Sequence, residues 1–157
     1  MITEMPFGFN GKIFRSPMPF SQYDIGLDVW LDYVKNRINV VVVLVEEVEF
    51  FDKAVRDLLK FYKDGGVEFI HYPISDFQTP LNKNALIGVI EEVISRAKNG
   101  DNIAVHCLAG IGRTGLFMAC MAKRYFQING QDAIGWVRNS IPGAVENSIQ
   151  ESYILNF

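Results

Sequence analysis

The chain has 157 residues, of which 49% are hydrophobic and 21% charged, and its formal net charge at pH 7 is −3. This size suits one compact domain spanning residues 1–157, and the apolar content excludes intrinsic disorder. The slightly acidic charge argues against nucleic acid or an acidic membrane surface as a partner. No apolar run reaches the length of a membrane span, and the first residues lack the pattern of a signal peptide.

The cysteine and histidine content excludes a disulfide scaffold and a structural zinc site. The chain has 2 cysteines and 2 histidines, and their spacing matches no zinc motif. We therefore expect no metal and no cofactor. A free reactive thiol requires a reducing compartment, which makes the cytoplasm the expected location. Nothing in the composition indicates an oligomeric state.

Short β-type runs alternate with longer helical runs through the first half of the chain. A short strand is predicted at Lys12–Arg15 and a helix at Asp24–Lys35. The predicted apolar stripe of this helix consists of Ile25, Leu27, Trp30, Leu31 and Val34. The continuous β-branched run Val40–Val45 is typical of a strand buried on both faces. A helix is then predicted over Phe50–Lys63.

The second half continues the same alternation. Strands are predicted at Val67–His71 and Ile103–Cys107, separated by a long amphipathic helix at Asn82–Lys98. Three further helices are predicted at Thr114–Phe126, from Gly130 to about Asn139, and from about Glu146 to the end. Strands alternating with helices predict an α/β fold in which a central, mostly parallel sheet is flanked by helices.

The segment 106–115, His-Cys-Leu-Ala-Gly-Ile-Gly-Arg-Thr-Gly, joins the last predicted strand to a helix. A helix N-terminus offers unpaired N–H groups and partial positive charge, which together bind anions. Gly110 and Gly112 allow the backbone to curl so that successive N–H groups point inward. Phosphate would lie against the loop residues Leu108, Ala109, Gly110, Ile111, Gly112 and Arg113.

Cys107 and Arg113 supply this loop with a nucleophile and a cation. Helix N-termini and nearby cations lower the pKa of thiols, and the thiolate is the nucleophilic form. The planar guanidinium of Arg113 can bind two oxygens of a phosphate at once. The loop therefore predicts a thiolate directed at the phosphorus atom of a phosphate ester. The alternative is a buried structural cysteine before an ordinary turn.

The His-Cys-x5-Arg-Thr-Gly pattern resembles the phosphate loop of the protein tyrosine phosphatase superfamily, in particular its small archaeal and cell-cycle-type dual-specificity members. The resemblance covers most of the chain from Val40 onward. It implies a cysteine phosphatase fold and a two-step hydrolysis through a cysteinyl phosphate. It also implies that His106 supports the loop and the thiolate. Thr114 could hydrogen-bond the sulfur, cap the helix, or do both.

The leaving group of such a reaction must be protonated, which requires a general acid. Asp76 follows a predicted strand and lies 31 residues before the nucleophile, similar to the acid loop of the small dual-specificity phosphatases. We expect it to be that acid, although an aspartate can also simply cap a turn.

The segment 142–150, Pro-Gly-Ala-Val-Glu-Asn-Ser-Ile-Gln, resembles a family segment whose terminal glutamine positions the hydrolytic water. This resemblance assigns that role to Gln150, with an ordinary exposed helix glutamine as the alternative. The family usually has an arginine before the proline, where this chain has Ile141. Any phosphate contact by that arginine is therefore missing.

The remaining Cys and His residues are expected to be structural. Cys120 lies about 10 Å along the helix from the loop, too far for an unstrained disulfide with Cys107. We expect it in the core. His71 ends a predicted strand and is expected to be a hydrogen-bonded core histidine.

The expected substrate is a singly phosphorylated protein or peptide. The loop has no lysine, whereas phosphoinositide members of the family carry lysines there, although Lys12, Arg15 or Arg138 could compensate. The short chain implies a shallow pocket that admits phosphoserine and phosphothreonine as well as phosphotyrosine. Two alternatives remain open: a rhodanese-like sulfurtransferase and a catalytically silent phosphopeptide-binding module.

Overall fold

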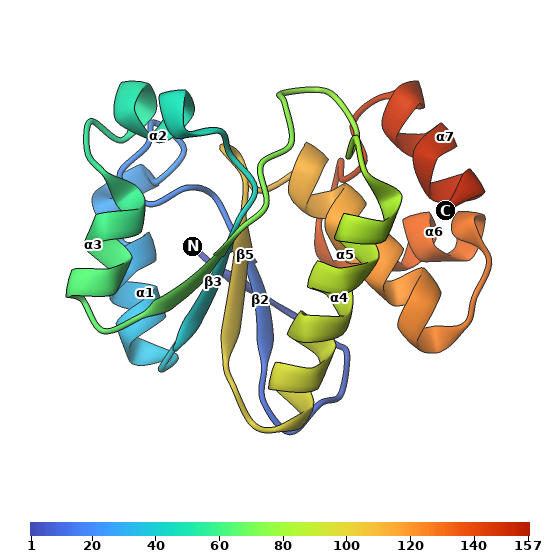
Figure 1. Cartoon of the computed structure of the whole chain (residues 1–157), viewed down its shortest axis with the longest axis horizontal. Helices are drawn as coiled ribbons and strands as arrows, with labels where there is room; N and C mark the ends of the chain where they lie inside the picture. Colours follow the sequence, from blue (N-terminus) through green and yellow to red (C-terminus); the bar gives the residue numbers. More distant parts are fainter.

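The computed structural model describes residues 1–157, and its strands form one 5-stranded sheet (Figure 1). In spatial order the strands are β1 (Thr3–Met5), β2 (Ile13–Ser16), β5 (Ile103–His106), β3 (Val40–Val43) and β4 (Glu68–His71). β1 is antiparallel to β2, and every other pairing is parallel. The predicted α/β fold with a mostly parallel sheet is confirmed.

Helices lie on both sides of this sheet (Figure 1). On one side are α1 (Val29–Lys35), α2 (Glu47–Lys53) and α3 (Leu58–Asp64). On the other side are α4 (Lys83–Lys98), α5 (Gly112–Phe126), α6 (Gly130–Ser140) and α7 (Ser148–Asn156). None of these helices combines the length and apolar character that a membrane span requires.

The buried apolar side chains form one cluster of 42 residues. All residues of β3 and β5 are buried, as continuous apolar runs in a parallel sheet predict. α5 is buried from Gly112 to Ala122, which fixes the residue that opens the helix against the core. The helix that begins at the phosphate-binding loop is therefore also the most enclosed helix of the fold.

The predicted helix over residues 24–35 is wrong in its start and in its buried face. A 3-10 turn (Ile25–Leu27) comes first, because Gly26 and Leu27 both have positive φ angles. The buried carboxylate of Asp24 accepts the N–H of Val29 at 3.0 Å, where the α-helix begins. Four residues of the predicted stripe are therefore exposed: Ile25, Leu27, Leu31 and Val34.

The predicted helix over residues 50–63 is two helices. Val55 has a positive φ of 52° and is exposed, and Asp57 then caps α3 by accepting the N–H of Lys60. α2 begins earlier than predicted, at Glu47, with a reciprocal capping interaction between Glu46 and Glu49. Strand β1 was not predicted, because its three residues are too few to show the alternation of apolar and polar residues that identifies a strand.

The carboxyl ends of the parallel strands meet at one edge of the sheet. β5 leads to Cys107, β3 leads to α2, and β4 leads to the loop 72–82. β2 ends on the other side of β5 from β3. Loops from four neighbouring strands therefore surround the phosphate-binding loop, in the place where α/β sheets bind ligands.

Candidate active site

The loop 107–111 curls between β5 and α5, and the structure shows one of its N–H groups directed at the sulfur. Gly110 has φ +75°, and its N–H points at the Cys107 sulfur at 3.3 Å. A Cβ at Gly110 would lie 2.3 Å from the Ser16 carbonyl oxygen, so only glycine fits. The Leu108 carbonyl accepts the N–H of Met18 at 2.9 Å, which ties the loop to the segment after β2. The Cys107 sulfur therefore lies against the backbone of a loop that is held in place by its neighbours.

Arg113 is held in place by two carboxylates, one from helix α2 and one from the loop 72–82. Its two Nη atoms bond the two carboxylate oxygens of Glu49 at 2.7 and 2.8 Å. Nη1 also donates to the Ile74 carbonyl at 3.0 Å, and Nη2 lies 3.1 Å from an Asp76 carboxylate oxygen. The Arg113 side chain is only 2% exposed, so its orientation is fixed before any ligand binds.

Glu49 was not identified from the sequence. Its carboxylate forms the bidentate ion pair with Arg113 and also accepts the backbone N–H of Glu46 at 2.9 Å. The available signal was the Glu-Glu-Val-Glu run directly after the central strand, at the sheet edge that holds the predicted site. That run was overlooked because charged residues at a helix start have an ordinary role as caps.

Asp76 lies at the site, but on an exposed loop. Its side chain is 48% exposed and contacts Arg113, and it also accepts the N–H of Phe77 at 3.1 Å. Phe77 has a positive φ of 59°, a strained conformation for an aromatic residue. Its carbonyl accepts a hydrogen bond from the Asn147 side chain at 3.0 Å. Few contacts therefore hold the predicted acid in position.

Thr114 makes neither of the predicted interactions. Its hydroxyl is buried without a hydrogen-bond partner, and the N-cap of α5 is Ile111. The sulfur instead accepts the Gly110 N–H.

His106 is fully buried and belongs to a chain of hydrogen bonds under the loop. One ring nitrogen bonds the Tyr62 hydroxyl and the other the Cys107 carbonyl, both at 2.9 Å. Nearby, the Tyr33 hydroxyl bonds Ser16 at 2.6 Å. Burial lowers the pKa of His106 to about 4, so the ring is neutral at pH 7. This geometry fits the predicted support of the loop.

Gln150 is fully buried in the first turn of α7, which contradicts the alternative of an exposed helix glutamine. Its Oε1 accepts the backbone N–H of Glu146 at 3.1 Å, and its Nε2 has no partner. A buried amide with a free donor is suited to hold a water molecule or a ligand oxygen.

Glu146 is a second acidic residue that the sequence analysis overlooked. Its carboxylate lies directly over Gly112, where a Cβ would come within 1.8 Å of Oε1. Burial raises the pKa of Glu146, the nearby charge of Asp76 raises it further, and Arg113 lowers it. The carboxyl group next to Gly112 therefore holds its proton more tightly than an ordinary glutamate does.

Comparison with known proteins agrees with this arrangement. Residues 28–126 match the family model described as Tc-R-P, the DSP-PTPase phosphatase of polymorphic toxin systems. The chain belongs to the dual-specificity phosphatase group of the protein tyrosine phosphatase superfamily.

Sequence relatives come from the same group. The dual specificity protein phosphatase CDC14C of Homo sapiens is 24% identical over 156 residues, which cover 99% of this chain and 32% of the relative. The cyclin-dependent kinase inhibitor 3 of Rattus norvegicus is 30% identical over 122 residues, covering 76% of this chain and 57% of the relative. The chain thus spans about a third of the length of the CDC14 relatives that it matches almost throughout.

Solved structures of the superfamily share the fold. The active form of Tk-PTP has a TM-score of 0.75 and 27% identity, and the match covers 98% of this chain and 94% of that chain. Kinase-associated phosphatase has a TM-score of 0.85 with 22% identity, covering 98% and 91% of the two chains, which shows the fold alone.

Ile141, where the resemblance implies an arginine, lies in the core. It is 1% exposed, so no cation reaches the phosphate-binding loop from this position. Arg138, one turn earlier, is bonded to the Ala144 and Val145 carbonyls and to Glu151. It is therefore not available for a phosphate. Lys12 is likewise paired with Glu4.

Cys120 lies in the core, as predicted, whereas His71 is hydrogen-bonded as predicted but lies outside the core. Cys120 is a free, fully buried thiol whose pKa burial raises, and neither cysteine is in a disulfide. His71 is half-buried and bonds the Val45 carbonyl at 2.9 Å.

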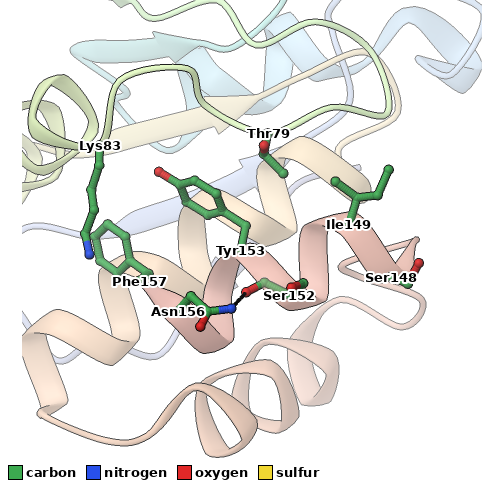
Figure 2. Close-up of a pocket in the computed structure, with 8 residues that line it drawn as sticks. All are labelled: Thr79, Lys83, Ser148, Ile149, Ser152, Tyr153, Asn156 and Phe157. Atoms are coloured by element: carbon green, nitrogen blue, oxygen red, sulfur yellow. Dashed lines mark hydrogen bonds between the residues drawn. The ribbon is translucent and has the colours of Figure 1, made fainter.

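A cavity away from the phosphate-binding loop lies between α7 and the region where the acid loop meets α4 (Figure 2). It has a volume of about 450 Å³, and Figure 2 shows the Tyr153 hydroxyl pointing away from Thr79, toward the side of the cavity where Lys83 lies. The Tyr153 hydroxyl is buried without a partner, and burial raises the pKa of Tyr153 to about 12. No residue of the loop 107–113 lines this cavity.

Proposed function

We propose that this chain hydrolyses phosphotyrosine, phosphoserine and phosphothreonine esters of proteins through a cysteinyl-phosphate intermediate. One observation carries the proposal. The Cys107 sulfur shares a glycine-lined loop with a guanidinium that also contacts the Asp76 carboxylate. This arrangement supports the roles of nucleophile for Cys107, anion-binding group for Arg113 and proton donor for Asp76.

In the first step the Cys107 thiolate attacks phosphorus while the bond to the leaving oxygen breaks. Arg113 and the inward N–H groups stabilise the charge on the phosphoryl oxygens. Asp76 donates its proton to the leaving oxygen, so that a neutral alcohol or phenol departs. The contact between Asp76 and Arg113 supports this role, because it keeps the acid beside the group that holds the phosphate.

In the second step water attacks the phosphocysteine, and the sulfur–phosphorus bond breaks to release phosphate and thiolate. Asp76, now ionised, accepts the proton of the attacking water. Gln150 orients that water through its Nε2, which has no partner in the protein.

Other groups around the loop act through these residues. Glu49 fixes the direction of the Arg113 fork. The neutral His106 holds the Cys107 carbonyl and thereby the loop conformation. Glu146 must remain protonated or turn away when a phosphate dianion enters, because two adjacent negative charges repel each other.

The absence of lysine within the loop favours a substrate with one phosphate at the reacting position. The free thiol favours a reducing compartment, and we place the protein in the cytoplasm on that ground.

Hydrolysis of p-nitrophenyl phosphate in the presence of EDTA tests the proposal. Cys107→Ser should lower kcat/KM by more than about 1,000-fold, because a hydroxyl is a far weaker nucleophile than a thiolate. Cys120→Ala is the matched control and should retain the wild-type rate constant. Full activity in Cys107→Ser would refute the mechanism. Turnover of thiosulfate instead of phosphate esters would show a sulfurtransferase, and binding of phosphopeptides without hydrolysis would show a silent module.

A further inference from the structure

A second cavity borders the phosphate-binding loop on the side away from the acid loop. It has a volume of about 660 Å³, within the ~300–1,000 Å³ typical of ligand pockets. Ala109 of the loop lines one part, and Arg15 and Pro17, from the end of β2, line another. Because β2 and β4 lie on opposite sides of β5, this cavity and Asp76 are on opposite sides of Cys107.

Arg15 is a cation without a partner. It is half-buried, its Nε is buried with no hydrogen-bond partner, and no carboxylate forms an ion pair with it. By contrast, Arg96, Arg113, Arg124 and Arg138 each pair with a carboxylate. Burial lowers the pKa of Arg15, and the charge of Cys107 raises it. Arg15 pairs in register with Val105 on the neighbouring strand, two residues before Cys107.

A half-buried charge without a counter-ion costs free energy, and a matching anion would recover part of it. Two carboxylates line the cavity: Asp28 directly precedes α1, and Asp32 lies within it. Neither forms a bond to Arg15. Of the three cations that could supplement the loop, Lys12 and Arg138 are already engaged. Lys35 of α1 also lines the cavity without an ion pair, but it is exposed, so Arg15 is the half-buried cation of this cavity that remains available.

We propose that this cavity binds a second anionic group of the substrate, a carboxylate or phosphate on a residue next to the phosphorylated one, and that Arg15 pairs with it. This inference rests on the proposed phosphatase function. Neighbouring strands lie about 4.8 Å apart and consecutive Cα atoms of a peptide about 3.8 Å apart, so a side chain on the residue next to the phosphorylated one can span from β5 to β2.

The rest of the cavity favours a peptide over a phosphorylated ring. Tyr23 and Ile25 line it and are 44% and 85% exposed, which offers apolar surface to side chains. Asp28 and Asp32 would repel a ring bearing phosphates on several sides. An extended peptide can place one anion at Arg15 and uncharged groups elsewhere.

The test compares kcat/KM for three phosphopeptides that differ only beside the phosphorylated residue, where they carry glutamine, glutamate or a second phosphate. Wild type should prefer the two anionic peptides by about ten-fold, the value of one charge-assisted hydrogen bond. Comparison of the glutamate peptide with the doubly phosphorylated peptide shows which anion the subsite accepts. Arg15→Met, which keeps the apolar stem, should abolish the preference, and Arg15→Lys should restore part of it. Lys12→Met is the matched control and should retain the preference.

The ratio of kcat/KM between the peptides distinguishes a failure of the proposed subsite from a failure of the proposed phosphatase function. A wild type that cleaves the three peptides equally well would overturn the subsite but not the phosphatase function, whereas failure on every peptide would overturn the function itself. An equal loss on all peptides in Arg15→Met would show that Arg15 acts on Cys107 and not on the substrate. Faster turnover of a soluble inositol phosphate than of any peptide would also overturn the proposal.

Discussion

The phosphate-binding loop and the acid loop differ in how firmly they are held. Cys107 and Arg113 are 3% and 2% exposed, and the core and three neighbouring loops fix them. Asp76 and Phe77 are largely exposed and depend on contacts with Arg113 and Asn147. In the proposed mechanism, the half of the site that would bind phosphate is therefore held in place, whereas the half that would donate the proton has fewer contacts and more freedom to move.

Because Asp76 is exposed, its side chain can be replaced without loss of the fold. Asp76→Asn should lower kcat/KM by about 100-fold for an alkyl phosphate, whose leaving group needs a proton, and far less for an activated aryl phosphate. The measurement is the rate constant across a series of leaving groups. Asp64→Asn, at the exposed end of α3, is the control. Equal losses for all leaving groups would argue against Asp76 as the acid.

The free energy of unfolding should depend on pH through His106, which lies under the phosphate-binding loop. Burial lowers its pKa from 6.5 to about 4, so the unfolded state binds the proton more readily than the folded state. The stabilisation is complete above pH 6.5 and is lost as the pH falls toward 4, with a loss of about 2 kcal/mol at pH 5.

Urea unfolding at pH 7.5 and pH 5 checks this dependence. His106→Asn should reduce the difference in unfolding free energy between the two pH values by about 2 kcal/mol. His71→Asn, which removes the other histidine, should leave it unchanged. An unaltered difference in His106→Asn would mean that carboxyl groups alone cause the acid sensitivity.

Orientation of the anion-binding group should depend on Glu49. Glu49→Gln keeps the side-chain shape but removes the charge that holds the Arg113 fork, and it should lower kcat/KM by about ten-fold. Glu47→Gln, an exposed neighbour in the first turn of α2, should have no effect. A loss of the same size in both variants would indicate a general effect on α2.

Glu146 lies where the two halves of the site meet. Glu146→Gln should strengthen binding of inorganic phosphate about five-fold near neutral pH, because it removes a carboxyl group beside the incoming dianion. Competitive inhibition by phosphate measured from pH 5 to 8 should show the gain increasing with pH. Glu92→Gln on α4 is the control, and a weaker affinity in Glu146→Gln would overturn this assignment.

The smallest expected effect on catalysis concerns the hydrogen bond from the Asn147 side chain to the Phe77 carbonyl, which ties the loop that contains Asp76 to the start of α7. Asn147→Ser retains a cap for α7 but removes the donor to the Phe77 carbonyl, and it should lower kcat about three-fold. Asn129→Ser at the start of α6 loses no such tether and should match wild type. Identical rate constants in all three proteins would show that the tether does not influence catalysis.

The contrast between the two halves also explains what could be predicted from the sequence. The apolar strands and the glycine-rich loop have local patterns, so the sheet, Cys107 and Arg113 were predictable. Glu49 and Glu146 lie far from the loop in sequence and reach it only through the tertiary fold. The breaks at Gly26 and Val55 were hidden by apolar periodicity, which continues through residues whose backbone angles cannot continue a helix.

The central claim is that Cys107 carries the phosphoryl group between two steps. The direct measurement is to mix the wild-type protein with p-nitrophenyl phosphate, denature it during turnover, and locate any phosphoryl group by mass spectrometry. We predict that the group is on Cys107, absent from Cys120, and more abundant in Gln150→Leu because hydrolysis of the intermediate is slowed. Sustained hydrolysis by a Cys107→Ser variant, or a phosphoryl group found only on another residue, would contradict the account.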